Sequence, residues 1–176
     1  MKKVLLTCLI LLIMPFTAMA HDEADLSQPL STPIYSDIEI RNWTSTAITT
    51  ALTFQFNSIP RDLKNSSRYF TPKGWDSFYK ALQKSRIIET VQSRHQIVTT
   101  TIMGSPIIQS QRDVEGVYEW VVMVPIVTTY QAGKESKSQK LLATVVINRT
   151  NDAPQISGLE KSPYGIGINQ AIMVPR

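Results

Sequence analysis

Cysteine is almost absent from this sequence. The one cysteine, Cys8, stands within the first twenty residues, and only two histidines occur, His21 and His95. If residues 1–20 are removed, as argued below, the remaining chain has no thiol and so can form no disulfide, thiolate nucleophile or cysteine-held metal site. Its stability must then come from an ordinary hydrophobic core, which a chain of about 150 residues is long enough to bury.

Long apolar runs are also absent, except at the N-terminus. Residues 4–14 are apolar apart from Thr7 and Cys8, and two lysines precede them. This run is shorter than the roughly twenty residues that cross a bilayer comfortably. A short apolar run after a basic start is typical of a bacterial signal peptide. The alternatives are an uncut anchor, which the short run disfavours, and a lipoprotein lipidated on Cys8, for which Thr7 is a poor preceding residue.

The predicted cleavage site follows directly. Pro15 ends the apolar run, and Ala18 and Ala20 form the small-x-small pattern that signal peptidase accepts. Cleavage after Ala20 would leave an exported, periplasmic chain that begins at His21 and has no stable membrane anchor. Two of the 18 basic residues leave with the signal, so 16 remain against 14 acids and the net charge is about +2. That balance argues against nucleic acid as a partner.

Sequence motifs for catalysis are missing as well. The chain has no nucleophile elbow, phosphate-binding glycine loop, zinc-protease motif or acidic calcium loop, so we expect no enzyme, no cofactor and no metal site. The candidate acids and bases are Asp76, His95 and Glu119, and nothing in the sequence brings two of them together. A free N-terminal His21 could chelate copper with His95 as a third nitrogen, but the helical character of the first half argues against that kind of site.

The chain does contain two kinds of apolar pattern, a helical period in its first half and β-branched strand segments in its second half. Together they predict one domain over residues 37–176. Residues 21–36 carry two prolines and little apolar periodicity, which indicates a flexible or loosely docked lead-in. Two helices are predicted after it, and Pro60 ends the first unit before a short polar turn or helix at residues 61–68. The first helix has the apolar stripe Ile40, Trp43, Ala47, Ala51 and Phe54; the second has Thr71 as its N-cap, Pro72 as its first residue and the stripe Trp75, Phe78 and Leu82.

After about residue 92, β-branched residues replace the helical period. The predicted strands are 95–103, 107–114, 116–131 and 140–149, with a polar hairpin loop at 132–139 and a closing strand or docked tail at the C-terminus. Pro125 within the third strand predicts a bulge or an edge position. Helices followed by a meandering sheet indicate an α+β fold, in which helices pack in the concave face of a curved antiparallel sheet.

Four sequence blocks in this order carry a resemblance to a known family. They are "FQF" at residues 54–56, "YFTPKGWDSFYKAL" at 69–82, "GVYEWVVMVPIVTTYQ" at 116–131 and "GIGINQAI" at 165–172. This succession resembles the periplasmic domain of the DotI/IcmL family, which is related to the conjugation protein TraM. Members of that family are inner-membrane components of type IVB (Dot/Icm) secretion systems.

The resemblance implies a cone-shaped fold like that of nuclear transport factor 2. It also implies a non-catalytic assembly module that contacts secretion-apparatus proteins, including the membrane-anchored family member, and forms homo- or hetero-oligomers. The family-motif residues are then core residues rather than a catalytic set: Trp43, Phe54, Tyr69, Phe70, Trp75, Phe78, Tyr118, Trp120, Gly165 and Gly167. The chain departs from the family at its start, where a cleavable signal replaces the membrane-spanning helix. The rival interpretation is a cone that binds or converts a small ligand.

Overall fold

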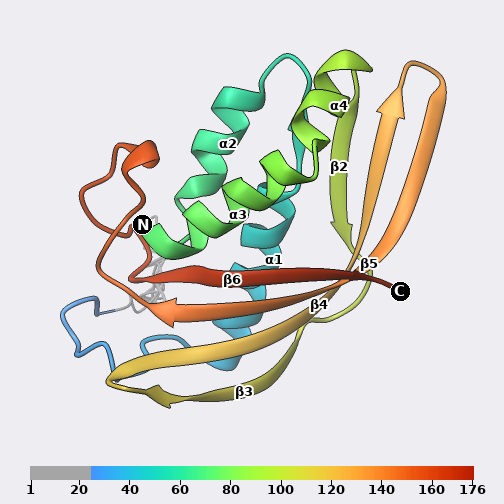
Figure 1. Cartoon of the computed structure of the whole chain (residues 1–176). Coiled ribbons are helices and arrows are strands. Elements are labelled where there is room, and N and C mark those ends of the chain that lie inside the picture. Colours follow the sequence, from blue (N-terminus) through green and yellow to red (C-terminus); the bar gives the residue numbers. More distant parts are fainter. Residues whose placement is uncertain (1–24) are drawn as a thin grey trace, which may run out of the picture.

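A computed structural model describes residues 25–176, and within them four α-helices pack against one side of a six-stranded antiparallel sheet (Figure 1). The helices are α1 (Asp37–Ala51), α2 (Ile59–Ser67), α3 (Pro72–Lys84) and α4 (Ile87–Ser93). The strands are β1 (Phe54–Gln55), β2 (Ile97–Ile102), β3 (Ile107–Val114), β4 (Val117–Ala132), β5 (Glu135–Arg149) and β6 (Ile166–Pro175). A single 3-10 turn, Gln155–Ser157, lies in the connection before β6.

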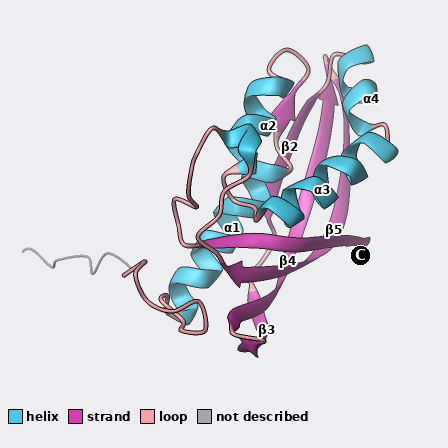
Figure 2. Ribbon diagram, turned by 60° about the vertical axis from the view of Figure 1, so that its left-hand side comes forward, coloured by secondary structure: helices cyan, strands magenta, loops and turns pink. Residues whose placement is uncertain are grey.

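The sheet has the strand order β1-β2-β4-β5-β6, and β3 pairs with the first half of β4 on the same side as β2. The helices all lie on the concave side, as the turned view shows (Figure 2). The concave side is filled by large buried side chains, among them Trp120, Phe70 and Ile126. The predicted α+β architecture is therefore confirmed.

The two main helices both begin at residues that cap them. Ser36 and Glu39 form a reciprocal capping box at α1, with the Ser36 backbone N–H donating to Glu39 Oε2 at 2.8 Å. At α3, the Thr71 hydroxyl accepts a hydrogen bond from the backbone N–H of Gly74 at 2.9 Å, and Pro72 is the first helical residue. The N-cap prediction for the second helix is thus confirmed.

Two of the predicted helix ends are wrong. The first helix stops at Ala51, because Phe54 turns away from the helical stripe to pair with Val98 of β2. Pro60 does not end a unit but stands in the first turn of α2, where its missing N–H costs nothing. The structure also contains a helix, α4, that the sequence did not predict; it follows Arg86, whose left-handed φ of 55° separates it from α3.

Pro125 lies where β4 changes partner. One edge of β4 pairs with β3 as far as Met123 and then with β2 from Ile126 onward. Pro125 falls between these two partners. Its carbonyl accepts from the Met103 N–H at 2.8 Å, which shows that the backbone of Pro125 points into this gap. The strand loses no ladder donor there, which explains how proline is tolerated in a long central strand.

The hairpin between β4 and β5 is longer than predicted. The polar stretch at 132–139 was expected as a loop, but β5 already begins at Glu135 and pairs with β4 as far as Ala132. Only Gly133 and Lys134 form the turn, with Gly133 at a φ of 57°. The side chains at this end of the hairpin are polar and mostly exposed, so its composition hides the strand.

Residues 25–36 of the lead-in are hydrogen-bonded to the domain. The buried guanidinium of Arg149 donates to the carbonyl oxygens of Gln28 (2.9 Å), Thr32 (3.2 Å) and Gly165 (2.7 Å), and the Tyr118 N–H donates to Leu30 O at 2.7 Å. The hydrogen-bonded unit therefore reaches upstream of the predicted domain start at residue 37.

Candidate protein-interaction surface

The ten family-motif residues gather in or beside the core. Seven are buried: Phe54, Phe70, Trp75, Phe78, Trp120, Gly165 and Gly167. Trp43, Tyr69 and Tyr118 are half-buried and pack against the core. The residues of the predicted signal cleavage site, Ala18, Ala20 and His21, lie outside the described residues.

Aromatic residues in and just before α3 hold the helix onto the beginning of β6. Phe70 packs against Trp75 and Phe78, with ring centroids 5.4 and 4.8 Å apart. The backbone of β6 approaches closely: Thr71 N–H donates to Ile168 O at 3.0 Å, and Ile168 N–H donates to Tyr69 O at 2.8 Å. A Cβ on Gly167 would lie 2.7 Å from Thr71 N, so this contact requires a glycine. These residues have a structural role.

A second aromatic cluster connects α1 with the segments that precede α3 and β6. Trp43, Tyr69 and Tyr164 are in mutual contact, with the two tyrosine rings stacked at a centroid distance of 5.3 Å. Burial, followed by a side-chain hydrogen bond with Tyr69, raises the pKa of Tyr164 to about 12. The hydroxyl of Tyr35 donates to Tyr164 O at 2.9 Å, which ties the lead-in to this cluster.

The candidate acids and bases lie on three different elements. Asp76 is exposed on α3 and paired with Lys80 at 2.7 Å. His95 is exposed in the turn before β2, where its ring packs edge-on against Phe56. Glu119 is on β4, on the side of the sheet opposite the helices. Within residues 25–176 there is no group of three or more histidine, cysteine or acidic side chains placed to bind a metal.

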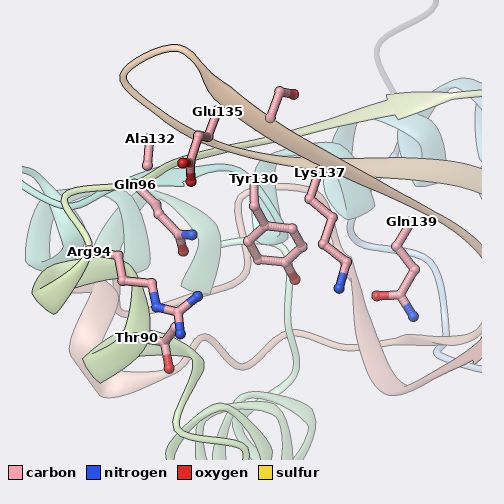
Figure 3. A pocket seen from close by; sticks show the side chains of 9 residues that line it. Thr90, Arg94, Gln96, Tyr130, Ala132, Glu135, Lys137 and Gln139 are labelled. Atoms are coloured by element: carbon pink, nitrogen blue, oxygen red, sulfur yellow. The ribbon is translucent and has the colours of Figure 1, made fainter.

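A hollow of about 390 Å³ lies between the end of α4 and the β4–β5 hairpin. Arg94, Tyr130 and Lys137 point into it from three elements, with Gln96 and Glu135 beside them (Figure 3). Burial raises the pKa of Tyr130, while the two cations are exposed to solvent. The hollow is lined from the concave side of the hairpin and contains none of the candidate residues Asp76, His95 and Glu119, so it gives little support to a catalytic site.

The outer side of the sheet, opposite the helices, is apolar over four strands. We call this surface the outer-face patch. It comprises Ile107 of β3, Val121, Met123, Pro125 and Val127 of β4, Leu142 and Val146 of β5, and Ile172 and Val174 of β6.

The strand register places these residues side by side on one surface, with Thr144 as a polar residue among them. Ile107, Met123, Thr144 and Ile172 stand directly opposite one another across β3, β4, β5 and β6. With strands about 4.8 Å apart and a rise of about 3.4 Å per residue, the patch measures roughly 14 by 20 Å. Ile107 is 58% exposed and Ile172 is 50% exposed. None of the helices between residues 25 and 176 covers this side (Figure 2).

A patch of roughly 14 by 20 Å is close in area to the largest apolar patch that a typical monomeric protein exposes, and such patches are often functional. Polar residues bound it along the strands, with Glu119 at one end and Lys140 at the other. The signal for the patch is visible in the sequence, because both faces of the predicted strand at 116–131 carry apolar residues. Half-buried antiparallel sheets normally alternate apolar and polar residues instead.

Comparison with known proteins assigns the family. The type IVb secretion system DotI/IcmL family, described as an inner-membrane complex component, matches residues 16–174. The chain belongs to this family. No curated protein sequence matches it.

Solved structures of the family share both fold and extent. The periplasmic domain of DotI is 32% identical with a TM-score of 0.74, and the match covers 82% of this chain and 99% of that one. A periplasmic fragment of TraM is 24% identical with a TM-score of 0.69, covering 81% and 99% of the two chains. An IcmL-like type IV secretion protein from Legionella pneumophila is 19% identical with a TM-score of 0.69, covering 81% and 94%.

These matches confirm the predicted family and the predicted cone-shaped α+β fold. Partners of a family component are proteins of the secretion complex. No helix among residues 25–176 is both long and apolar enough to span a bilayer.

Proposed function

We propose that this chain is an exported, periplasmic adaptor or scaffold module that works with a type IVB secretion system through protein contacts and without catalysis. The observation that carries the proposal is the outer-face patch. It is apolar across four strands, and no described helix or loop covers it, whereas the concave side of the cone is filled by its own side chains. A filled cone and an apolar exterior suit a protein that binds other proteins.

The proposed partners are other components of the secretion apparatus, including the membrane-anchored family member. We propose that the patch seats a partner surface, with homo- or hetero-oligomers as the product. Burying the patch removes apolar area from water, and the polar residues around it fix the register of the contact. Cleavage after Ala20 would release the module to dock on the anchored complex from the periplasmic side.

The test is capture of the tagged protein from its native host after crosslinking in living cells, followed by mass spectrometry. The proposal predicts that named secretion-apparatus proteins are recovered and that the captured chain begins at His21. Ile172→Lys, which places a charge in the patch, should reduce that recovery at least tenfold. Asp76→Lys on the opposite side of the domain is the matched control and should recover as much as the wild type. Equal recovery of apparatus proteins with both variants would show that the outer-face patch does not bind them.

The same experiment separates the rival function. A protein that is recovered alone and as a monomer would point instead to binding of a small ligand. The hollow beside Tyr130 would then be the first place to look.

A further inference from the structure

β6 is an edge strand with a hydrogen-bonding side that faces no other strand. The Arg176 N–H donates to Lys140 O at 3.1 Å, which fixes the alternation of the antiparallel ladder between β5 and β6. The backbone groups of β6 that form hydrogen bonds with β5 are therefore those of Gln170, Ile172 and Val174. The N–H and C=O groups of Ala171 and Met173 point the other way, toward the open edge.

Only the beginning of this edge is closed. Ile168 bonds to Tyr69 and Thr71, and a Cβ on Gly74 would lie 1.9 Å from Ile168 O, so α3 sits tightly against β6 at that point. Further along, α3 and β6 diverge (Figure 1). Among the described residues, none forms a hydrogen bond with the open-edge groups of Ala171 or Met173.

An apolar groove of about 310 Å³ runs along this open edge, between α3 and β6. Its floor and walls include Phe78, Ala81 and Leu82 of α3, Ile87 of α4, and Ala171 and Met173 of β6. The side chains of Ala171 and Met173 face the concave side, so the groove and the free hydrogen-bonding groups belong to the same two residues. A ligand that used both would have a backbone along β6 and apolar side chains at alternate positions.

Two cations adjoin one of the residues that line the groove. Lys84 and Arg86 flank Ser85, which lines the groove, and both are exposed. Neither cation forms an ion pair with any residue between 25 and 176. The charge therefore favours acidic residues in whatever occupies the groove.

We infer that β6 and the groove beside α3 form a second binding site, which accepts an extended segment of a partner protein as an added edge strand. The segment has apolar side chains at alternate positions and acidic residues at its end. This site lies on the edge of the sheet rather than on its outer side, and it does not rest on the outer-face patch. Addition of a strand completes the hydrogen bonds of Ala171 and Met173 and fills the groove with apolar side chains.

The test uses a synthetic peptide of about nine residues, within the usual range of strand lengths. It alternates threonine with valine or leucine and carries acidic residues at both ends, so that either strand direction can bring an acid to Lys84. Two further peptides are methylated on alternate backbone nitrogens. One is methylated at the odd-numbered residues and the other at the even-numbered residues. An added strand pairs through one edge only, so one methylated peptide should lose binding at least tenfold and the other should bind like the parent. Amide shifts in NMR spectra of the whole protein should map to Ala171 and Met173.

Two protein variants sharpen the test. Met173→Pro removes an N–H that points to the open edge and leaves the ladder with β5 intact, so the variant should fold and bind the peptide at least tenfold more weakly. Lys84→Glu combined with Arg86→Glu should weaken binding and remove its salt dependence, whereas Lys64→Glu on α2 should not.

Failure of the parent peptide to bind at millimolar concentration would overturn the proposal. So would equal binding of the two methylated peptides, or full binding by a folded Met173→Pro protein. If Met173→Pro does not fold, the pair of methylated peptides decides the question with the wild-type protein.

Discussion

Arg149→Met tests whether the lead-in is an integral part of the domain. The Arg149 side chain is only 2% exposed, and its guanidinium donates three hydrogen bonds, all to backbone carbonyls. Two of these carbonyls, on Gln28 and Thr32, belong to the lead-in, and the third belongs to Gly165. Methionine keeps the apolar stem and removes all three donors.

The expected loss follows from these contacts. A hydrogen bond to a charged group contributes about 1.5–3 kcal/mol, but the guanidinium has no carboxylate among its hydrogen-bond partners, so its desolvation offsets part of the sum. Burial also lowers the pKa of Arg149, because desolvation disfavours the charged guanidinium. Once the lead-in detaches, water can hydrate the carbonyls of Gln28 and Thr32. We therefore expect unfolding free energy to fall by about 3 kcal/mol, which lowers the thermal midpoint by roughly 6–12 °C.

Urea unfolding measures the loss of stability, and hydrogen exchange shows whether the lead-in detaches. The Tyr118 N–H, which donates to Leu30 O at 2.7 Å, should lose protection in Arg149→Met, while the Trp120 N–H within the sheet keeps it. In a chain that lacks residues 21–33, Arg149→Met should cost much less, because two of the three acceptors are already gone. A loss below about 1 kcal/mol in the full chain, or equal losses in both chains, would refute the reasoning.

Two further predictions concern α3 and the aromatic cluster. Gly74→Ala should destabilise the protein by about 2–3 kcal/mol in urea unfolding, because the new Cβ would fall on Ile168 O. Gly104→Ala is the control: its Cβ would meet only Pro125 Cγ, at 3.6 Å, so stability should change by less than about 0.5 kcal/mol. Equal losses of stability in the two variants would contradict this prediction. The pKa of Tyr164 is raised from 10.0 to about 12, so the unfolded chain loses this proton first and stability should fall as the pH rises from about 10 to 12. Tyr164→Phe should show a shallower fall over that range in pH-dependent unfolding, and an unchanged slope would contradict the assignment.

Local sequence signals predict part of this fold well. The Thr-Pro start of α3 and the positions of β2, β3 and β4 depend on capping chemistry and on side-chain alternation, both of which act within a few residues. The β4–β5 hairpin was mistaken for a loop because its residues are polar on both faces, and they are polar because the hairpin extends past the core. The break at Arg86 was missed because a left-handed arginine carries no sequence signal.

The candidate surfaces divide in the same way. The apolar outer side of β4 can be recognised in the sequence from the two apolar faces of one strand, but its union with Ile107 and Ile172 depends on the register of four strands. The role of Arg149 could not be predicted, because two of its three acceptors lie more than a hundred residues upstream in the lead-in and all three are backbone atoms without a residue preference. Long-range pairing of that kind appears only in the folded chain.

Site-specific photocrosslinking in living cells tests the central claim most directly. A photoreactive residue is placed at Ile172 in the outer-face patch, or at Lys80 on the exposed side of α3 as the control, and products are identified by mass spectrometry. The account predicts a discrete crosslink from position 172 to a secretion-apparatus protein and none of comparable yield from position 80. Crosslinks of equal yield from both positions, or no apparatus protein from position 172, would contradict it.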